Sequence, residues 1–204
     1  MLLTKHLIPG ALALAMVAAQ AAAAPVDDRY TCEHGSAEVG VPACNRAISS
    51  GRFNGRDLAA LYSERGARLG NLGEYTRAIK DLDRAIQLSP PTDTVLKYRC
   101  WVLTIAGQPQ RALADCDRSL QLKSDDAGAL NSRGLAYLRL GQLDHAIADY
   151  DAALRISQKF PSVLYGRGIA KLKKGDTIGG NADIVAATKI QPNIAEDFAR
   201  YGVK

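Results

Sequence analysis

Residues 59–92 read AALYSERGARLGNLGEYTRAIKDLDRAIQLSPPT. The stretch contains two amphipathic segments, which are separated by a glycine turn at Gly73. The next 34 residues repeat this plan, the 34 after them repeat it again, and a weaker fourth copy covers residues 161–194. Because self-similarity at a constant period of this length is typical of helical solenoids, the sequence predicts a stack of helix pairs.

Several positions recur in all four copies without insertion or deletion. The turn glycine recurs as Gly73, Gly107, Gly141 and Gly175. A small residue follows five positions later, as Ala78, Ala112, Ala146 and Gly180. This pattern resembles the tetratricopeptide repeat (TPR) family, in which small residues lie where the two helices of a repeat meet. The resemblance implies an all-α fold: a right-handed superhelix, or α-solenoid, of antiparallel helix pairs with capping helices at both ends.

The resemblance also implies a division of the chain. The expected segments are an N-terminal cap at 25–58, four repeats at 59–92, 93–126, 127–160 and 161–194, and a C-terminal cap at 195–204. In the caps we expect an irregular start with one helix at 41–50, and a short solvating helix at 193–201. Because adjacent glycines weaken a helix, the last repeat helix, which contains Gly179 and Gly180, is expected to start late or to kink.

Residues 1–24 have the composition of a secretory signal peptide. A weakly positive start at Lys5 precedes an apolar run and a stretch of small residues with Ala-x-Ala cleavage options. The alternative is an uncleaved membrane anchor, which is disfavoured because the apolar run only just reaches spanning length. Cleavage within residues 21–24 would release a periplasmic or secreted protein with no stable membrane insertion. The alanine-rich signal suggests a Gram-negative bacterium.

Composition argues against nucleic-acid binding. The 204 residues carry a net charge of +5, and acidic and basic side chains are mixed within each repeat without a long basic run. Histidine-based catalysis is also disfavoured, because His145 is expected on an outer helix face and no Ser-His-Asp grouping or phosphate loop is present. The sequence therefore predicts a protein that is not an enzyme and that uses no cofactor.

The four cysteines of an exported chain suggest two disulfides. Cys32 and Cys44 are close in sequence and would fasten the N-terminal cap. Cys100 and Cys116 lie at nearly equal distances from the turn at residues 107–108, so they face each other across one helix pair. The alternatives are that Cys100 and Cys116 are buried free thiols, or that Cys32, His34 and Cys44 hold a metal, for which a fourth ligand is not apparent.

An arginine occupies the same position in each repeat, where the family pattern has an aliphatic residue. Each arginine lies level with an aspartate on the second helix of its own repeat, and the pairs are Arg65–Asp81, Arg99–Asp115, Arg133–Asp149 and Arg167–Asp183. One interpretation is an arginine row that binds an acidic partner. The favoured interpretation is a structural ladder, because a buried arginine needs a carboxylate partner and the two residues occur together in every copy.

The resemblance implies that first-helix residues at fixed positions line a concave groove. The residues expected to bind a peptide there are Lys97, Trp101, Asn131, Leu135, Arg139, Tyr165, Ile169 and Lys173. Trp101, Leu135 and Ile169 lie 34 residues apart and are expected to form an apolar row on the groove floor. Large apolar side chains that are exposed usually mark an interaction surface, although packing under a neighbouring helix is the alternative.

These features predict a non-enzymatic periplasmic adaptor or scaffold that binds a protein or peptide partner in its concave groove. The alternative is a metal-binding or enzymatic protein with its site in the N-terminal Cys/His segment. The two hypotheses differ in whether Cys32 and Cys44 are bonded to each other or are free to bind a metal.

Overall fold

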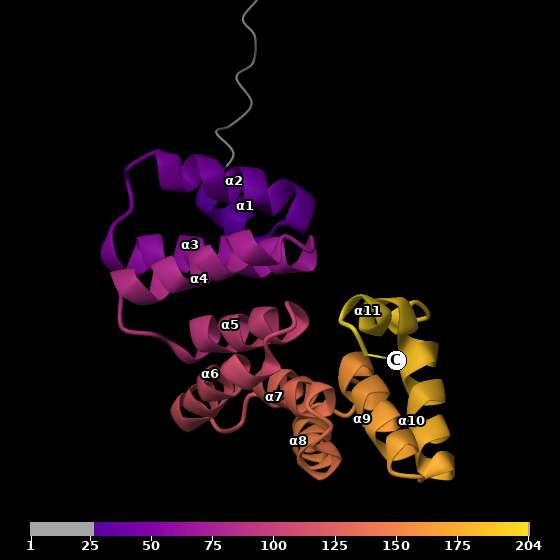
Figure 1. Cartoon of the computed structure of the whole chain (residues 1–204). Helices are drawn as coiled ribbons and strands as arrows, with labels where there is room; N and C mark the ends of the chain where they lie inside the picture. The colour runs from indigo at the N-terminus through magenta and orange to yellow at the C-terminus, as the bar shows by residue number, and fades with distance from the viewer. Residues whose placement is uncertain (1–26, 204) are drawn as a thin grey trace, which may run out of the picture.

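The computed structural model describes residues 27–203, which form eleven α-helices and contain no strand (Figure 1). The helices are α1 Asp28–His34, α2 Ala37–Ser49, α3 Gly55–Asn71, α4 Tyr75–Leu88, α5 Asp93–Ile105, α6 Pro109–Leu122, α7 Ala127–Arg139, α8 Leu143–Ile156, α9 Pro161–Lys173, α10 Thr177–Ile190 and α11 Ile194–Arg200. Consecutive helices pack in antiparallel pairs, and the pairs stack into a curved array. The expected all-α helix-pair architecture is confirmed.

One turn geometry joins the helices of the four central pairs. In the first of these turns, Gly73 has a φ of 79°, a left-handed conformation that favours glycine. The Glu74 N–H donates to the Leu69 carbonyl at 2.9 Å, and the Gly73 N–H donates to the Gly70 carbonyl at 3.1 Å. These two bonds form a Schellman motif, which satisfies carbonyls at the helix end. The recurring glycine therefore ends the first helix and reverses the chain.

Tyr150 shows why small residues are needed where helices meet. Its side chain is fully buried, and it lies against Gly134 of α7 and Gly166 of α9. A Cβ at Gly134 would lie 2.8 Å from Tyr150 Cε1, and a Cβ at Gly166 would lie 2.5 Å from Tyr150 Cζ. Any larger residue at either glycine would therefore clash with the aromatic ring and separate the helices.

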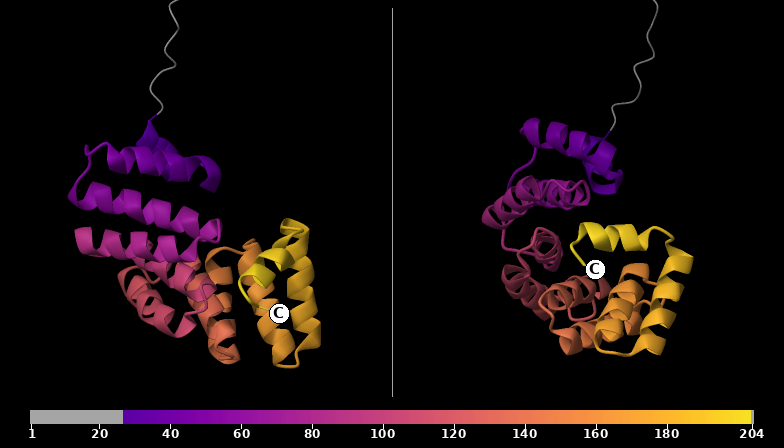
Figure 2. Two further views of the ribbon diagram at one scale, coloured as in Figure 1. Left: turned by 45° about the horizontal axis from the view of Figure 1, so that its top comes forward. Right: turned by 45° about the vertical axis from the view of Figure 1, so that its right-hand side comes forward.

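The C-terminal helix α11 lies on the inner side of the array. Figure 2 shows α11 extending from the end of α10 back toward the first helix pairs. Ile194 and Phe198 of α11 are buried in the main apolar core. Tyr201 and Arg200 line a small cavity of about 100 Å³ together with Tyr75, which follows the α3–α4 turn. The helix expected to solvate the end of the array thus buries an apolar face instead, because Ile194, Phe198 and Tyr201 share one helix face.

The N-terminal cap also differs from expectation. The segment expected to be irregular contains α1, and α2 begins at Ala37, four residues before the expected start at Val41. The Asp27 side chain accepts hydrogen bonds from the N–H groups of Arg29 and Tyr30, which starts α1. The expected late start of α10 is wrong as well. Asp176 accepts a hydrogen bond from the Gly179 N–H at 2.9 Å and thereby caps the helix at the glycines.

Residues 1–24, for which a signal peptide is predicted, lie outside the described residues. Within residues 27–203, no helix is both long and apolar enough to cross a membrane.

Candidate functional site

The four predicted Arg–Asp pairs meet in the structure with one geometry. In each pair the arginine donates from Nε and Nη2 to the two carboxylate oxygens of its aspartate. For Arg133 and Asp149, both bonds are 2.8 Å long. The corresponding bonds lie between 2.6 and 2.8 Å in the pairs Arg65–Asp81, Arg99–Asp115 and Arg167–Asp183. Such bidentate pairing gives both strength and a defined orientation.

The remaining guanidinium nitrogen reaches back to the preceding helix pair, a contact that the sequence analysis missed. Nη1 of Arg133 donates to Asp117 at 2.8 Å, and Nη1 of Arg99 donates to Asp83 at 2.8 Å. Arg167 donates in the same way to Asp151, and Arg65 donates to Asn45 of α2. The sequence signal for this contact was an Asp-x-Asp pattern in the second helix of three of the four repeats. In the fourth repeat, Val185 replaces the second aspartate.

The electrostatic environment of these arginines favours a structural role for them. The hydrogen bond to Asp149 raises the pKa of Arg133, although burial opposes this shift. Burial alone would raise the pKa of Asp183, but hydrogen bonds from Arg167 and Lys171 hold it below its ordinary value. The guanidinium donors that point along the array are thus already paired, which favours a structural ladder over an arginine row that recognises a partner.

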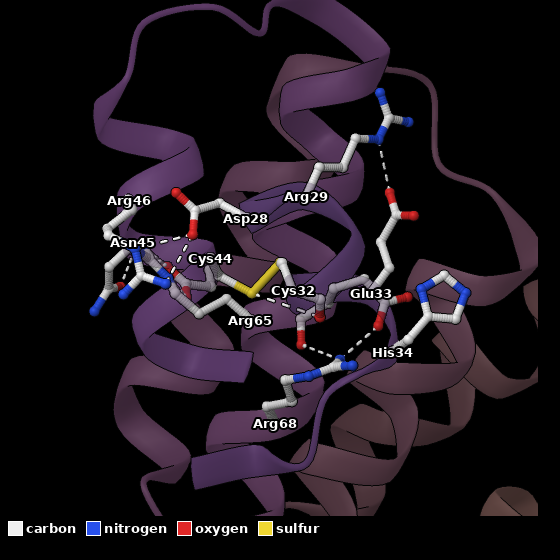
Figure 3. Close-up of a disulfide and its surroundings, with 12 residues drawn as sticks. Asp28, Arg29, Cys32, Glu33, His34, Cys44, Asn45, Arg46, Arg65 and Arg68 are labelled. Atoms are coloured by element: carbon white, nitrogen blue, oxygen red, sulfur yellow. Dashed lines mark hydrogen bonds and ion pairs between the residues drawn. A yellow bond between two sulfur atoms is a disulfide. The ribbon is translucent and has the colours of Figure 1, made fainter. Parts of the chain in front are cut away.

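Two disulfides are present, and they pair the cysteines as favoured from the sequence. Cys32–Cys44 joins α1 to α2, with a Cα–Cα distance of 4.7 Å (Figure 3). Arg46 of α2 pairs with Asp28 of α1 at 2.7 Å beside this bridge. Because the two sulfur atoms are bonded to each other, they are not available as thiolate ligands for a metal. His34 instead stacks on the ring of Tyr30, at 4.3 Å between ring centroids.

The second bridge, Cys100–Cys116, joins α5 to α6 with a Cα–Cα distance of 5.3 Å. Both cysteines are fully buried in a small core cluster that also contains Leu103 and Ala112. Among residues 27–203, no group of three or more His, Cys, Asp or Glu side chains is placed to hold a metal ion.

A groove of about 520 Å³ opens on the inner side of α3, α5 and α7, and the α1–α2 connection forms one wall. Three of the predicted binding residues line it, namely Lys97, Trp101 and Asn131. Asn71, at a groove position of the first repeat, also lines it, and further lining residues that the sequence did not predict are Glu33, Ser36, Glu64, Arg68 and Tyr98. The groove therefore combines two aromatic side chains with amides, hydroxyls and charges of both signs.

The charged groups of the groove are already paired. Lys97 Nζ donates to Asp126 at 2.7 Å, and Arg68 Nη1 donates to Glu64 at 2.7 Å. Although burial alone would raise the pKa of Asp126, the hydrogen bond from Lys97 holds it below its ordinary value, so the carboxylate stays ionised. Asn131 donates to the Ser162 hydroxyl at 3.2 Å. Because the cations are neutralised, the groove offers little net charge to a ligand.

Trp101 is half-buried and packs on two core clusters while it lines the groove. Its indole lies on Gly70 of α3, where a Cβ would be 2.7 Å from Cζ3. The predicted row of Trp101, Leu135 and Ile169 is wrong for its other two members. Leu135 is only 3% exposed, and Ile169 is partly buried against the same core cluster and does not line the groove. The stacking of α7 against both α5 and α9 makes Leu135 a core residue.

The other predicted groove residues lie in the C-terminal half, which α11 covers. Tyr165 packs on Phe198 of α11, with 4.8 Å between ring centroids. Arg139 Nη1 donates to the Thr104 carbonyl at 2.7 Å and lies close to Gly202. Lys173 is exposed and is not part of the groove lining. The chain itself therefore occupies this half, and among residues 27–203 the open half of the inner face is the one around Trp101.

Comparison with known proteins agrees with the architecture. Residues 59–92 and residues 105–164 each match the tetratricopeptide repeat family. Within the array, these two stretches thus resemble tetratricopeptide repeats. Proteins with this repeat are typically non-enzymatic scaffolds. No curated protein matches the sequence.

Solved structures share the fold at low sequence identity. A MamA fragment from Desulfovibrio magneticus RS-1 is 20% identical, with a TM-score of 0.63 over 81% of this chain and 92% of its own. YrrB, described as a TPR protein with an unusual peptide-binding site, is 19% identical, with a TM-score of 0.57 over 80% and 84%. A tetratricopeptide repeat protein from Parabacteroides merdae ATCC 43184 is 20% identical, with a TM-score of 0.60 over 86% and 71%.

Proposed function

We propose that this protein is a non-enzymatic scaffold that binds a protein or peptide partner outside the cytoplasm. The binding site is the open half of the inner groove, formed by the α1–α2 connection, α3, α5 and α7. The observation that carries this proposal is the groove of about 520 Å³ around Trp101 and Tyr98. Large aromatic side chains next to polar groups are typical of the residues that dominate protein binding.

The chemistry of the groove limits the kind of partner. Its cations are held by Asp126 and Glu64, so a strongly acidic ligand would have to displace them. Asn71, Asn131 and Ser36 can exchange hydrogen bonds with a peptide backbone, because amides and hydroxyls both donate and accept. A partner segment with an apolar side chain on Trp101 and with its backbone along these groups fits best. The peptide-binding site described for YrrB supports this use of the fold.

The export part of the proposal is supported by the cysteines and the N-terminus. Disulfides persist in oxidising compartments and are rare in the cytosol, where thiols are kept reduced. The chain has four cysteines, and both bridges are buried within the array. Residues 1–24 have the composition of a cleavable signal. A periplasmic location in a Gram-negative cell accounts for both features.

Site-specific photo-crosslinking in the native host tests the site and the location together. A photoreactive amino acid replaces Asn71, which is exposed and lines the groove, or Gln121, which is exposed on α6 and serves as the matched control. We expect one discrete adduct from position 71 in the periplasmic fraction and none from position 121. Equal adducts from both positions, or an adduct only from position 121, would place the partner on another face.

A further inference from the structure

A second hollow lies beside the groove, between the first two TPR helix pairs. It has a volume of about 250 Å³ and is enclosed by α3, the end of α4 and the start of α5. Its walls are largely apolar, with Ala59, Ala60, Ala85, Pro90 and Val95 among the lining residues. We call this hollow the Ser63 pocket. Glu64 lines both the Ser63 pocket and the groove, so the two sites adjoin.

The Ser63 pocket contains a polar group without a partner. Ser63 is 6% exposed, and its Oγ has no hydrogen-bond partner among residues 27–203. A buried serine on a helix usually avoids this state by donating to the carbonyl four residues earlier. Ser132 of α7 does so, at 2.9 Å from the Gly128 carbonyl. Because an unsatisfied buried hydroxyl carries a desolvation cost, a group that entered the pocket and bonded Ser63 would remove that cost.

At the corresponding positions in the other TPR helix pairs, the side chain contacts a neighbouring element. The residues that lie 34, 68 and 102 positions after Ser63 in the sequence are Lys97, Asn131 and Tyr165. Lys97 bonds Asp126, Asn131 bonds Ser162, and Tyr165 packs on Phe198, so each side chain reaches the next element of the array. Ser63 is the shortest of the four side chains, and it leaves its junction open. Among these four equivalent positions in the described chain, Ser63 is thus the one whose side chain makes no such contact, and the space beside it is the Ser63 pocket.

We infer that the Ser63 pocket binds an aromatic ring with a hydroxyl at its tip, such as a tyrosine side chain of the partner. Cavities of about 150 Å³ accept a benzene ring, so this larger hollow has room for a phenol. The apolar walls suit the ring, and the serine hydroxyl can donate to or accept from the phenol oxygen after a rotation about χ1. Because the pocket adjoins the groove, this inference rests on the proposed function for its biological ligand.

The pocket can be tested without the partner. The mature chain is titrated with p-cresol, the tyrosine side-chain analogue, and with toluene, the phenylalanine analogue, while backbone amide NMR signals are followed. We expect p-cresol to shift the amides of Ala60, Ser63 and Val95 and to bind about fivefold more tightly than toluene. Ser63→Ala should lower the p-cresol affinity to that of toluene and leave toluene unchanged. Ser132→Ala, whose hydroxyl is already bonded, is the matched control and should change neither.

A second variant fills the space without removing the hydroxyl. Ala60→Leu places a larger side chain on the pocket wall and should abolish binding of both probes, with the fold checked by circular dichroism. Shifts confined to the groove around Trp101, equal affinities for the two probes, or p-cresol binding that survives Ser63→Ala would each overturn the inference. Because neither probe is a peptide, this result is independent of the crosslinking result at position 71, and the two proposals can fail separately.

Discussion

Arg133 illustrates how one side chain holds three helices together. It pairs with Asp149 on the second helix of its own pair and with Asp117 on the preceding pair. Asp149 is 6% exposed, so it depends on that partner for its charge. A buried charge that loses its partner costs far more free energy than an exposed one, because water cannot reach it. The ladder is therefore expected to stabilise the stacking of pairs as well as each pair.

Replacement of Arg133 tests this role. Arg133→Leu should lower the free energy of unfolding by roughly 2–4 kcal/mol, because Asp149 is left without a partner. The double variant Arg133→Leu with Asp149→Asn should recover part of that loss, as measured by urea unfolding. Arg155→Leu, an exposed arginine on α8, is the control. An unchanged unfolding midpoint for Arg133→Leu together with lost partner binding would reverse the assignment and make the arginines a recognition row.

The α1–α2 hairpin links stability to the groove at the level of elements. Helix α1 has only seven residues, which is too short to be stable alone in water. The Cys32–Cys44 bridge holds it to α2, and the groove wall receives Glu33 from α1 and Ser36 from the connection to α2. The second bridge fastens α5 to α6 away from that wall. The two bridges should therefore differ in their effect on binding, although both restrict the unfolded chain.

Paired cysteine variants separate these effects. Cys100→Ser with Cys116→Ser should lower the free energy of unfolding by about 3 kcal/mol and leave partner binding intact. Cys32→Ser with Cys44→Ser should lower stability and also weaken binding, because the groove wall is released. Thiol titration of the denatured, unreduced protein should find no free thiol. Two or more free thiols would contradict both bridges, and unaltered binding by the Cys32/Cys44 variant would remove α1–α2 from the site.

The sequence predicted the elements that a local pattern determines. The turn glycines, the Arg–Asp pairs and the facing cysteines follow from a constant spacing on helices. The start of α1 was missed because it depends on one capping residue, Asp27, in a segment without periodicity. The burial of Leu135 could not be read from spacing, since it depends on how closely α5, α7 and α9 stack. Prediction was thus reliable for helix pairs and poor for exposure.

At the scale of the whole molecule, the inner face is divided into two halves. Helix α11 covers the C-terminal half through contacts that include Tyr165 and Phe198, while the N-terminal half stays open around Trp101. The family resemblance places binding residues evenly along the inner face and does not show this division. It follows from the return of α11 across the array, which brings Tyr201 next to Tyr75. Partner binding is therefore expected at the N-terminal half alone.

The most direct test is the partner's dissociation constant for two groove variants, measured at a temperature where circular dichroism shows each one folded. Trp101→Ala removes the aromatic floor, and Asn71→Arg places a bulky side chain in the open half without touching the core. Both should weaken binding by at least tenfold, which corresponds to about 1.4 kcal/mol. His145→Ala, on the exposed side of α8, should bind like the wild type. Wild-type affinity in both groove variants would contradict the assignment of the partner site to this groove.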